Sequence, residues 1–144
     1  MKVIYLLVCL PALLAQPTPE DIKKEWRELI APYEELCANE SGADIAVIRE
    51  TWDTFVFSHD PAFKCYIWCI YENIPYLYPN GTINIEAVIG SVDGVTNEVI
   101  EKCIEPYGTC PDKCHGFWAF DHCLSDVLNL TTVKLDAPPC SVRK

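Results

Sequence analysis

The stretch "KCYIWCIYEN", residues 64–73, places two cysteines four positions apart among bulky apolar residues. Because apolar residues occur nearly all round the helical period, we expect a buried helix at the centre of the fold. Side chains at i and i+4 of a helix lie about 6 Å apart, whereas a disulfide needs Cβ atoms about 3.8 Å apart. Cys65 and Cys69 therefore predict links from this helix to two different elements.

The first residues indicate the cellular compartment. One basic residue, Lys2, precedes an apolar run over residues 3–14, and Ala15 is a suitable cleavage position. The run is shorter than the ~20 residues that a membrane helix needs. We therefore predict a secretory signal peptide over residues 1–15, with an uncleaved anchor as the alternative, and a secreted, extracellular chain that does not insert into membranes.

Removal of this segment changes two counts. Nine cysteines become eight because Cys9 is lost, and an even number is typical of a complete disulfide set. Loss of Lys2 lowers the basic residues from 11 to 10 against 21 acidic ones, a formal charge near −11. That charge argues against binding to nucleic acid or to anionic membranes and suits cationic partners.

Disulfides are the use of the cysteines that we expect, and zinc binding is the main alternative. The C-x3-C spacing of Cys65 and Cys69 recurs at Cys110 and Cys114, and four thiolates can hold zinc tetrahedrally. A zinc site would leave four further cysteines without partners, however, and secretion favours their oxidation. A thiol-redox motif has two residues between its cysteines, not three. We therefore predict no metal site and no cofactor.

Helical signals recur along the chain without sustained period-2 alternation, which predicts one all-α domain of about six short helices. The first is expected over residues 18–36, with a kink at Pro32 and an inward apolar stripe that ends at Leu36. The central helix is expected to start at Asp60, followed by a proline. The other helical stretches are expected at 45–55, at 84–89, at 96–108 and at 110–128.

The cysteine spacing carries a resemblance to a known family. Six cysteines follow the pattern C-x27-C-x3-C-x33-C-x10-C-x8-C, namely Cys37, Cys65, Cys69, Cys103, Cys114 and Cys123. This resembles the insect odorant-binding proteins (pheromone-binding and general odorant-binding proteins), whose signature has three residues between the second and third cysteines and eight between the fifth and sixth. The segments "FKCYIWCIYEN", "NGTINIEAVI" and "EVIEKC" are also similar to that family's third helix, turn and fifth helix. The resemblance covers roughly residues 18–128.

The resemblance implies a disulfide pairing of first with third, second with fifth and fourth with sixth cysteine. Carried over, the pairs are Cys37–Cys69, Cys65–Cys114 and Cys103–Cys123. Cys110 and Cys140 are then left to pair with each other, a departure from the six-cysteine pattern. We expect residues 16–128 to form the odorant-binding-like domain and residues 129–144 to form a tail tied back by the fourth disulfide.

The resemblance also implies an apolar cavity that holds small hydrophobic molecules such as odorants or pheromones. Disulfides replace part of a core and can keep such a cavity open. The expected ligand-binding residues come from the inward faces of several helices: Trp52, Phe55, Tyr66, Ile70, Ile89, Ile104, Phe117, Trp118, Phe120 and Leu124. For each of them, a place in an ordinary core is the alternative.

Three functions remain open at this point. The first is a carrier of small hydrophobic ligands, with a membrane odorant receptor as a further partner. The second is a salivary or haemolymph protein of the same fold that sequesters amines or lipid mediators, and the third is a secreted interaction protein without a cavity. We expect a monomer or weak homodimer. Catalysis is not expected, because "GSVDG" is not a Gly-x-Ser-x-Gly elbow and the neighbours Asp121 and His122 lack a nucleophile.

The sequence raises two further possibilities. Acceptor sequons for N-glycosylation occur at Asn39, Asn80 and Asn129, of which Asn80 lies in an expected turn. The tail is a candidate lid, and three histidines, His59, His115 and His122, are candidates for pH-dependent control of it. Histidines with satisfied contacts and no such role are the alternative.

Overall fold

The computed structural model describes residues 15–140, and these form seven α-helices and one 3-10 helix. In chain order they are α1 (Pro19–Ile30), η1 (Ala31–Tyr33), α2 (Glu34–Ser41), α3 (Ile45–Thr54), α4 (Pro61–Asn73), α5 (Ile85–Ile89), α6 (Asn97–Tyr107) and α7 (Lys113–Val127). No strand occurs in this part of the chain, so the predicted all-α class is confirmed. Most of the predicted signal peptide, residues 1–14, and the last residues of the tail, 141–144, lie outside the described residues.

The first predicted helix is divided in the structure, which raises the number of helices above six. The 3-10 helix η1 contains Pro32 and separates α1 from α2. A 3-10 turn has about 3.0 residues and an α-helical turn about 3.6. The residues of α2 that follow η1 therefore point in other directions than a continuous α-helix would give them. The expectation that Leu36 continues the inward stripe is therefore wrong, since its side chain is 45% exposed.

Local capping signals set where the helices begin. The side chain of Thr18 accepts a hydrogen bond from the Asp21 amide, while the Asp21 carboxylate accepts one from the Thr18 amide. This reciprocal pair is a capping box at the start of α1. Asp60 caps α4 and Asp112 caps α7. Each carboxylate accepts a hydrogen bond from a backbone amide in the first turn of its helix.

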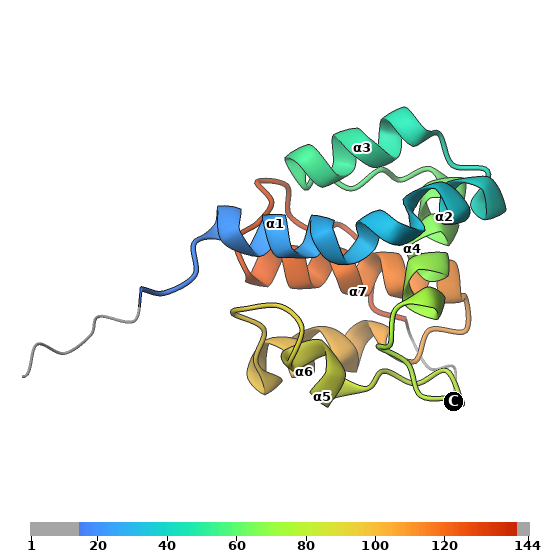
Figure 1. Cartoon of the computed structure of the whole chain (residues 1–144). Helices are drawn as coiled ribbons and strands as arrows, with labels where there is room; N and C mark the ends of the chain where they lie inside the picture. The colour runs from blue at the N-terminus through green and yellow to red at the C-terminus, as the bar shows by residue number, and fades with distance from the viewer. Residues whose placement is uncertain (1–14, 141–144) are drawn as a thin grey trace, which may run out of the picture.

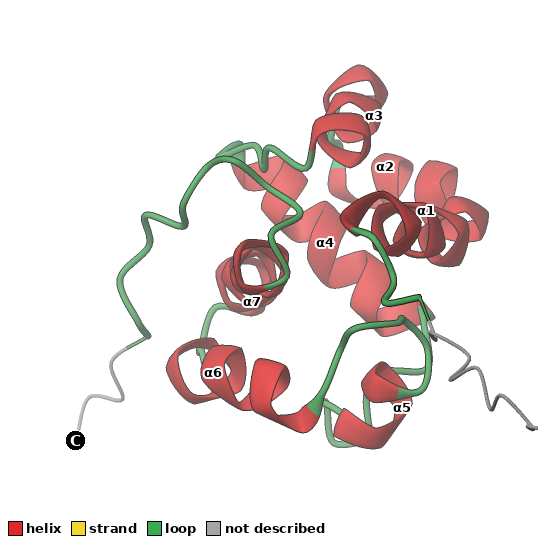
Figure 2. Ribbon diagram, turned by 90° about the vertical axis from the view of Figure 1, so that its left-hand side faces the viewer, coloured by secondary structure: helices red, strands yellow, loops and turns green. Residues whose placement is uncertain are grey.

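Helix α4 lies at the centre of the packing. It contacts α2 on one side and α7 on another, and α7 in turn contacts α6. Figure 1 shows α1 and α3 on one side of α7, with α5 and α6 on the other. In the turned view of Figure 2, α4, α7, α6 and α5 surround the interior that the core side chains occupy.

Four disulfides join these elements. Cys37–Cys69 links α2 to α4, Cys65–Cys114 links α4 to α7, Cys103–Cys123 links α6 to α7, and Cys110–Cys140 links the α6–α7 turn to the tail. The first three are the pairs that the family resemblance implies, and the fourth joins the two cysteines that the six-cysteine pattern leaves over. The two cysteines of "KCYIWCIYEN" thus bind partners on different helices, which explains how a four-residue spacing makes α4 the hub of the fold.

The described tail, residues 129–140, follows the outer side of α7 and α6 (Figure 2). The Tyr107 hydroxyl on α6 donates to the Ala137 carbonyl at 3.0 Å. The amide of Cys140 donates to the Pro106 carbonyl, also at 3.0 Å. Hydrogen bonds as well as the fourth disulfide therefore hold the tail against α6.

Candidate functional site

Most of the predicted ligand-binding residues lie in the core. Eight of them are at most 4% exposed: Trp52, Phe55, Tyr66, Ile70, Phe117, Trp118, Phe120 and Leu124. The other two, Ile89 and Ile104, are half-buried and pack against the edge of that core. The structure brings all ten into one apolar cluster, and their contact with a ligand remains a prediction.

One aromatic group lies between α3, α4 and the loop that joins them. Trp52 meets Phe55 and Phe57 edge to face, with ring centroids 5.7 and 5.8 Å apart. Phe63 lies 6.3 Å from Phe57 and 5.7 Å from Tyr66. The Trp52 indole donates to the Tyr66 hydroxyl at 3.2 Å, so these buried polar atoms satisfy each other.

A second aromatic group lies between α4, α7 and the turn after α4. Phe117 is 4.8 Å from both Trp68 and Tyr71, measured between ring centroids. Tyr71 is 6.1 Å from Phe120 and 6.1 Å from Tyr76. Tyr71 and Tyr76 are therefore members of the candidate site that sequence reasoning missed.

Trp118 does not join this second group, although it follows Phe117 directly. Its indole donates to the Ser58 carbonyl at 2.9 Å. The Lys64 ammonium lies 4.2 Å from its ring centroid, a cation–π contact. Trp118 thus packs against the α3–α4 loop, while Phe117 and Phe120 pack beside Tyr71.

A carboxyl group is buried beside the second aromatic group. Asp121 on α7 is 1% exposed, and its Oδ1 accepts a hydrogen bond from the Tyr71 hydroxyl at 3.0 Å. Burial raises the pKa of Asp121 from 3.8 to about 7, and the Tyr71 hydrogen bond opposes that rise only in part. No lysine, arginine or histidine forms an ion pair with Asp121 in residues 15–140.

The Tyr76 hydroxyl adds unused hydrogen-bonding capacity to this place. It is buried and has no partner among the described residues. The Ser91 hydroxyl donates to the Ala87 carbonyl and lies close enough to the Tyr76 hydroxyl to influence its pKa, although the two do not meet in hydrogen-bond geometry. Burial raises the pKa of Tyr76, the Ser91 hydroxyl opposes that rise in part, and the charge of Asp121 adds to it. A sequence signal was available for this polar cluster, because Asp121 is a charged residue next to the apolar run "FWAF".

His122 follows Asp121 in the sequence, but its side chain faces the tail and not Tyr71. Its Nε2 lies 3.1 Å from the Val133 carbonyl, and its ring stacks on Phe57 at 4.9 Å. Because a carbonyl only accepts hydrogen bonds, this contact assigns the proton to Nε2. Burial lowers the pKa of His122. Asp121 therefore contacts α4 while His122 contacts the tail, and the two do not form a hydrogen-bonded acid–base pair.

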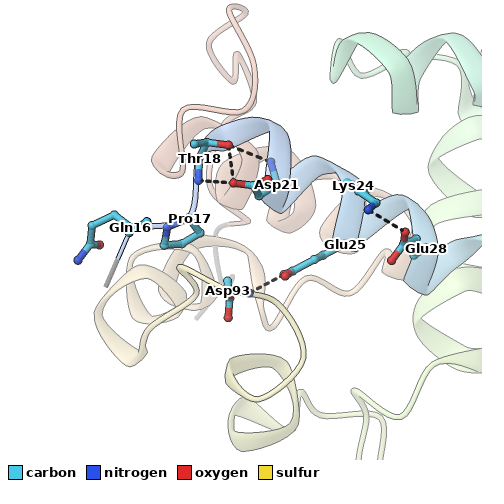
Figure 3. Close-up of a pocket in the computed structure, with 9 residues that line it drawn as sticks. Gln16, Pro17, Thr18, Asp21, Lys24, Glu25, Glu28 and Asp93 are labelled. Carbon is cyan, nitrogen blue, oxygen red and sulfur yellow. Dashed lines mark hydrogen bonds and ion pairs between the residues drawn. The ribbon is translucent and has the colours of Figure 1, made fainter. Parts of the chain in front are cut away.

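A polar recess of about 480 Å³ opens at the start of α1 (Figure 3). Its lining consists of Ala15, Gln16, Pro17, Thr18, Asp21, Lys24, Glu25, Glu28 and Asp93. Glu25 accepts a hydrogen bond from the Asp93 amide at 2.9 Å, and Lys24 lies 3.8 Å from the Glu28 carboxylate. Four carboxylates at one opening suit water and cations, and they do not suit an apolar ligand.

The three sequon asparagines, Asn39, Asn80 and Asn129, are all exposed. The side chain of Asn80 lies in the turn after α4 and accepts hydrogen bonds from the Thr82 amide at 3.0 Å and hydroxyl at 2.6 Å. Asn39 lies on α2, and Asn129 lies two residues after the end of α7. Exposure is necessary for glycosylation, and the modification itself stays a prediction.

Two further findings concern residues 15–140 as a whole. None of their helices is long and apolar enough to cross a membrane. Within the same range, no three histidine, cysteine or acidic side chains come together in a way that could hold a metal ion.

Comparison with known proteins agrees with the cysteine framework. No solved structure matches the chain. The profile of the PBP/GOBP family matches residues 19–126, from the first residue of α1 to the last turn of α7. This range covers well over half of the chain and contains three of the four disulfides. The chain therefore belongs to the PBP/GOBP family, the insect odorant-binding proteins that its cysteine spacing resembles.

Proposed function

We propose that this protein is a secreted carrier that binds small hydrophobic molecules inside its helical domain and moves them through extracellular fluid. The observation that carries the proposal is the family match over residues 19–126, which includes every helix that contributes to the aromatic interior. The four disulfides add support, because such bonds form and persist in extracellular compartments.

The interior has the composition of a ligand site. Its aromatic rings offer large apolar surfaces, and a few buried polar groups can orient a ligand among them. The disulfides raise the stability of the fold by limiting the entropy of the unfolded chain, and this added stability can offset the cost when a ligand separates some core side chains. A membrane odorant receptor and a weak homodimer remain proposals that belong with this function.

Binding of a naphthalene-based fluorescent probe to the oxidised protein beginning at Gln16 tests the proposal. We expect probe uptake with a dissociation constant on the order of micromolar and displacement by long-chain alcohols, esters or aldehydes. Phe117→Ala removes an interior ring and should change probe affinity at least about threefold. Val133→Ala, at a side chain that is 43% exposed, is the control and should leave it unchanged.

A second candidate is an interaction protein that works through its surface. The observation in its favour is the close contact of the predicted lining residues with one another in the core. Absence of probe uptake between pH 5 and pH 8, with native circular dichroism, would refute the carrier and favour this candidate.

A further inference from the structure

We propose that Asp121, Tyr71 and Tyr76 form the polar end of the ligand site, and that the ligand class they select is a primary amine carrying an apolar chain or ring. The inference rests on the proposed carrier function and specifies its ligand. It starts from an imbalance in the interior, where a buried carboxyl group and a buried hydroxyl are left with unused hydrogen-bonding capacity.

The donors and acceptors at this place match an ammonium group. Asp121 receives one hydrogen bond, from Tyr71, so its carboxylate can accept more. The Tyr71 oxygen keeps its lone pairs after donating, and the Tyr76 oxygen accepts no hydrogen bond, because the nearby Ser91 hydroxyl donates to the Ala87 carbonyl. An ammonium group carries three N–H donors and no acceptor. One carboxylate and two phenol oxygens therefore supply one acceptor for each of its protons.

Charge favours an amine over an alcohol or a carboxylic acid. An isolated buried carboxylate is costly unless it is paired with a cation, and residues 15–140 place no cationic side chain in contact with Asp121. A ligand ammonium would supply the missing cation. A ligand carboxylate would be repelled, and a neutral hydroxyl would leave the charge unbalanced. The net charge of −10 also attracts cations toward the protein.

The apolar part of such a ligand would meet aromatic surfaces. Phe117 and Phe120 flank Tyr71, with centroids at 4.8 and 6.1 Å. Aromatic faces also attract an ammonium group held within about 6 Å. Because Asp121 is 1% exposed and Tyr76 is 1% exposed, entry of the ligand requires Tyr76 and its turn to move away from α7.

Protonation should control binding through Asp121 itself. The titratable groups whose pKa values respond to the Asp121 charge are Tyr66 and Tyr71 on α4 and Tyr76 in the turn after it. Burial raises the pKa of each, so all three stay neutral between pH 6 and pH 8. Over that interval Asp121 changes from mainly neutral to mainly ionised. Affinity for an amine should therefore rise by about tenfold from pH 6 to pH 8.

The test compares 2-phenylethylamine with 2-phenylethanol, which differ only in the terminal group, by displacement of the naphthalene probe at pH 6 and pH 8. At pH 8 we expect the amine to bind at least about tenfold more tightly than the alcohol. Asp121→Asn keeps the shape but removes the charge, and should weaken the amine about tenfold or more while changing the alcohol less than about threefold. Glu25→Gln, in the recess at α1, is the matched control and should change neither.

Tyr76→Phe provides a second variant if Asp121→Asn fails to fold. It removes only a hydroxyl that makes no hydrogen bond of good geometry, so it should fold normally and weaken the amine at least about threefold. Equal affinity for amine and alcohol would overturn the inference while leaving the carrier function intact. Amine binding that Glu25→Gln abolishes would place the amine at the surface and also overturn it. Failure of both compounds and of the probe would refute the carrier function, and the inference with it.

Discussion

Replacement of Asp121 by asparagine should change how the stability of the protein depends on pH. Burial raises the pKa of this carboxyl group from 3.8 to about 7 in the folded protein. Between these two values the folded protein keeps a proton that the unfolded chain has released. Raising the pH through this window therefore lowers the free energy of unfolding.

The size of the effect follows from the two pKa values. A difference of about three pH units corresponds to about 4 kcal/mol when each unit contributes about 1.4 kcal/mol. Integrated for a single site, about 2.5 kcal/mol of that loss falls between pH 5 and pH 8. Asparagine has nearly the same shape and does not titrate, so Asp121→Asn should lack this part of the pH dependence.

Urea unfolding of the oxidised protein at pH 5, pH 6.5 and pH 8 measures the effect, with Asp136→Asn as the control because Asp136 is exposed. The stability difference between Asp121→Asn and the unaltered protein should shift in favour of the variant by about 2.5 kcal/mol from pH 5 to pH 8. The contribution of His122 is common to both proteins and cancels in this difference. Parallel curves for the two proteins would refute the reasoning, because they would mean that Asp121 is already ionised at pH 5.

Three further predictions concern packing, the tail and acid. Gly116→Ala should lower the free energy of unfolding by about 1–3 kcal/mol in urea, because the added Cβ would lie 2.6 Å from the Cβ of Cys110. In the control, Gly90→Ala, the added Cβ meets its nearest atom at an ordinary 3.4 Å, so this variant should be neutral or slightly stabilising. Equal losses of stability in the two variants would contradict this account. The double change Cys110→Ser and Cys140→Ser should cost about 2–4 kcal/mol and speed amide exchange at residues 130–140, whereas unchanged exchange would show that hydrogen bonds alone hold the tail. Because burial lowers the pKa of His122 below 6.5, the contribution of His122 to stability should fall as the pH drops below that value, opposite in sign to the contribution of Asp121; an NMR titration of His122 with a midpoint at or above 6.5 would disprove it.

The helix starts and the role of the central helix could be predicted from the sequence because they depend on local chemistry. Thr18 and Asp60 cap helices through contacts within a few residues, and the structure shows both caps. The spacing of Cys65 and Cys69 excluded a bond between them by helix geometry alone. The choice of their partners came from the family pattern and not from the spacing.

The candidate site depends on contacts that no local pattern contains. Tyr71 and Asp121 are fifty residues apart in the sequence and meet only because α4 packs against α7. Leu36 was expected to face inward, and the 3-10 turn before α2 placed it in solvent. Both Trp118 and Phe117 are buried, and the packing of α7 decided that Phe117 contacts Tyr71 while Trp118 contacts the α3–α4 loop.

By itself, the sequence determined an acidic, disulfide-rich, all-α domain with a cysteine-bearing helix at its centre, because periodicity, capping and cysteine spacing act over short distances along the chain. Only the tertiary structure decided which aromatic side chains share a surface and which polar groups are buried beside them. The pKa of Asp121 illustrates the reason: it depends on how much water the surrounding helices exclude and on a hydroxyl from another helix. Neither quantity exists until α4 and α7 have come together.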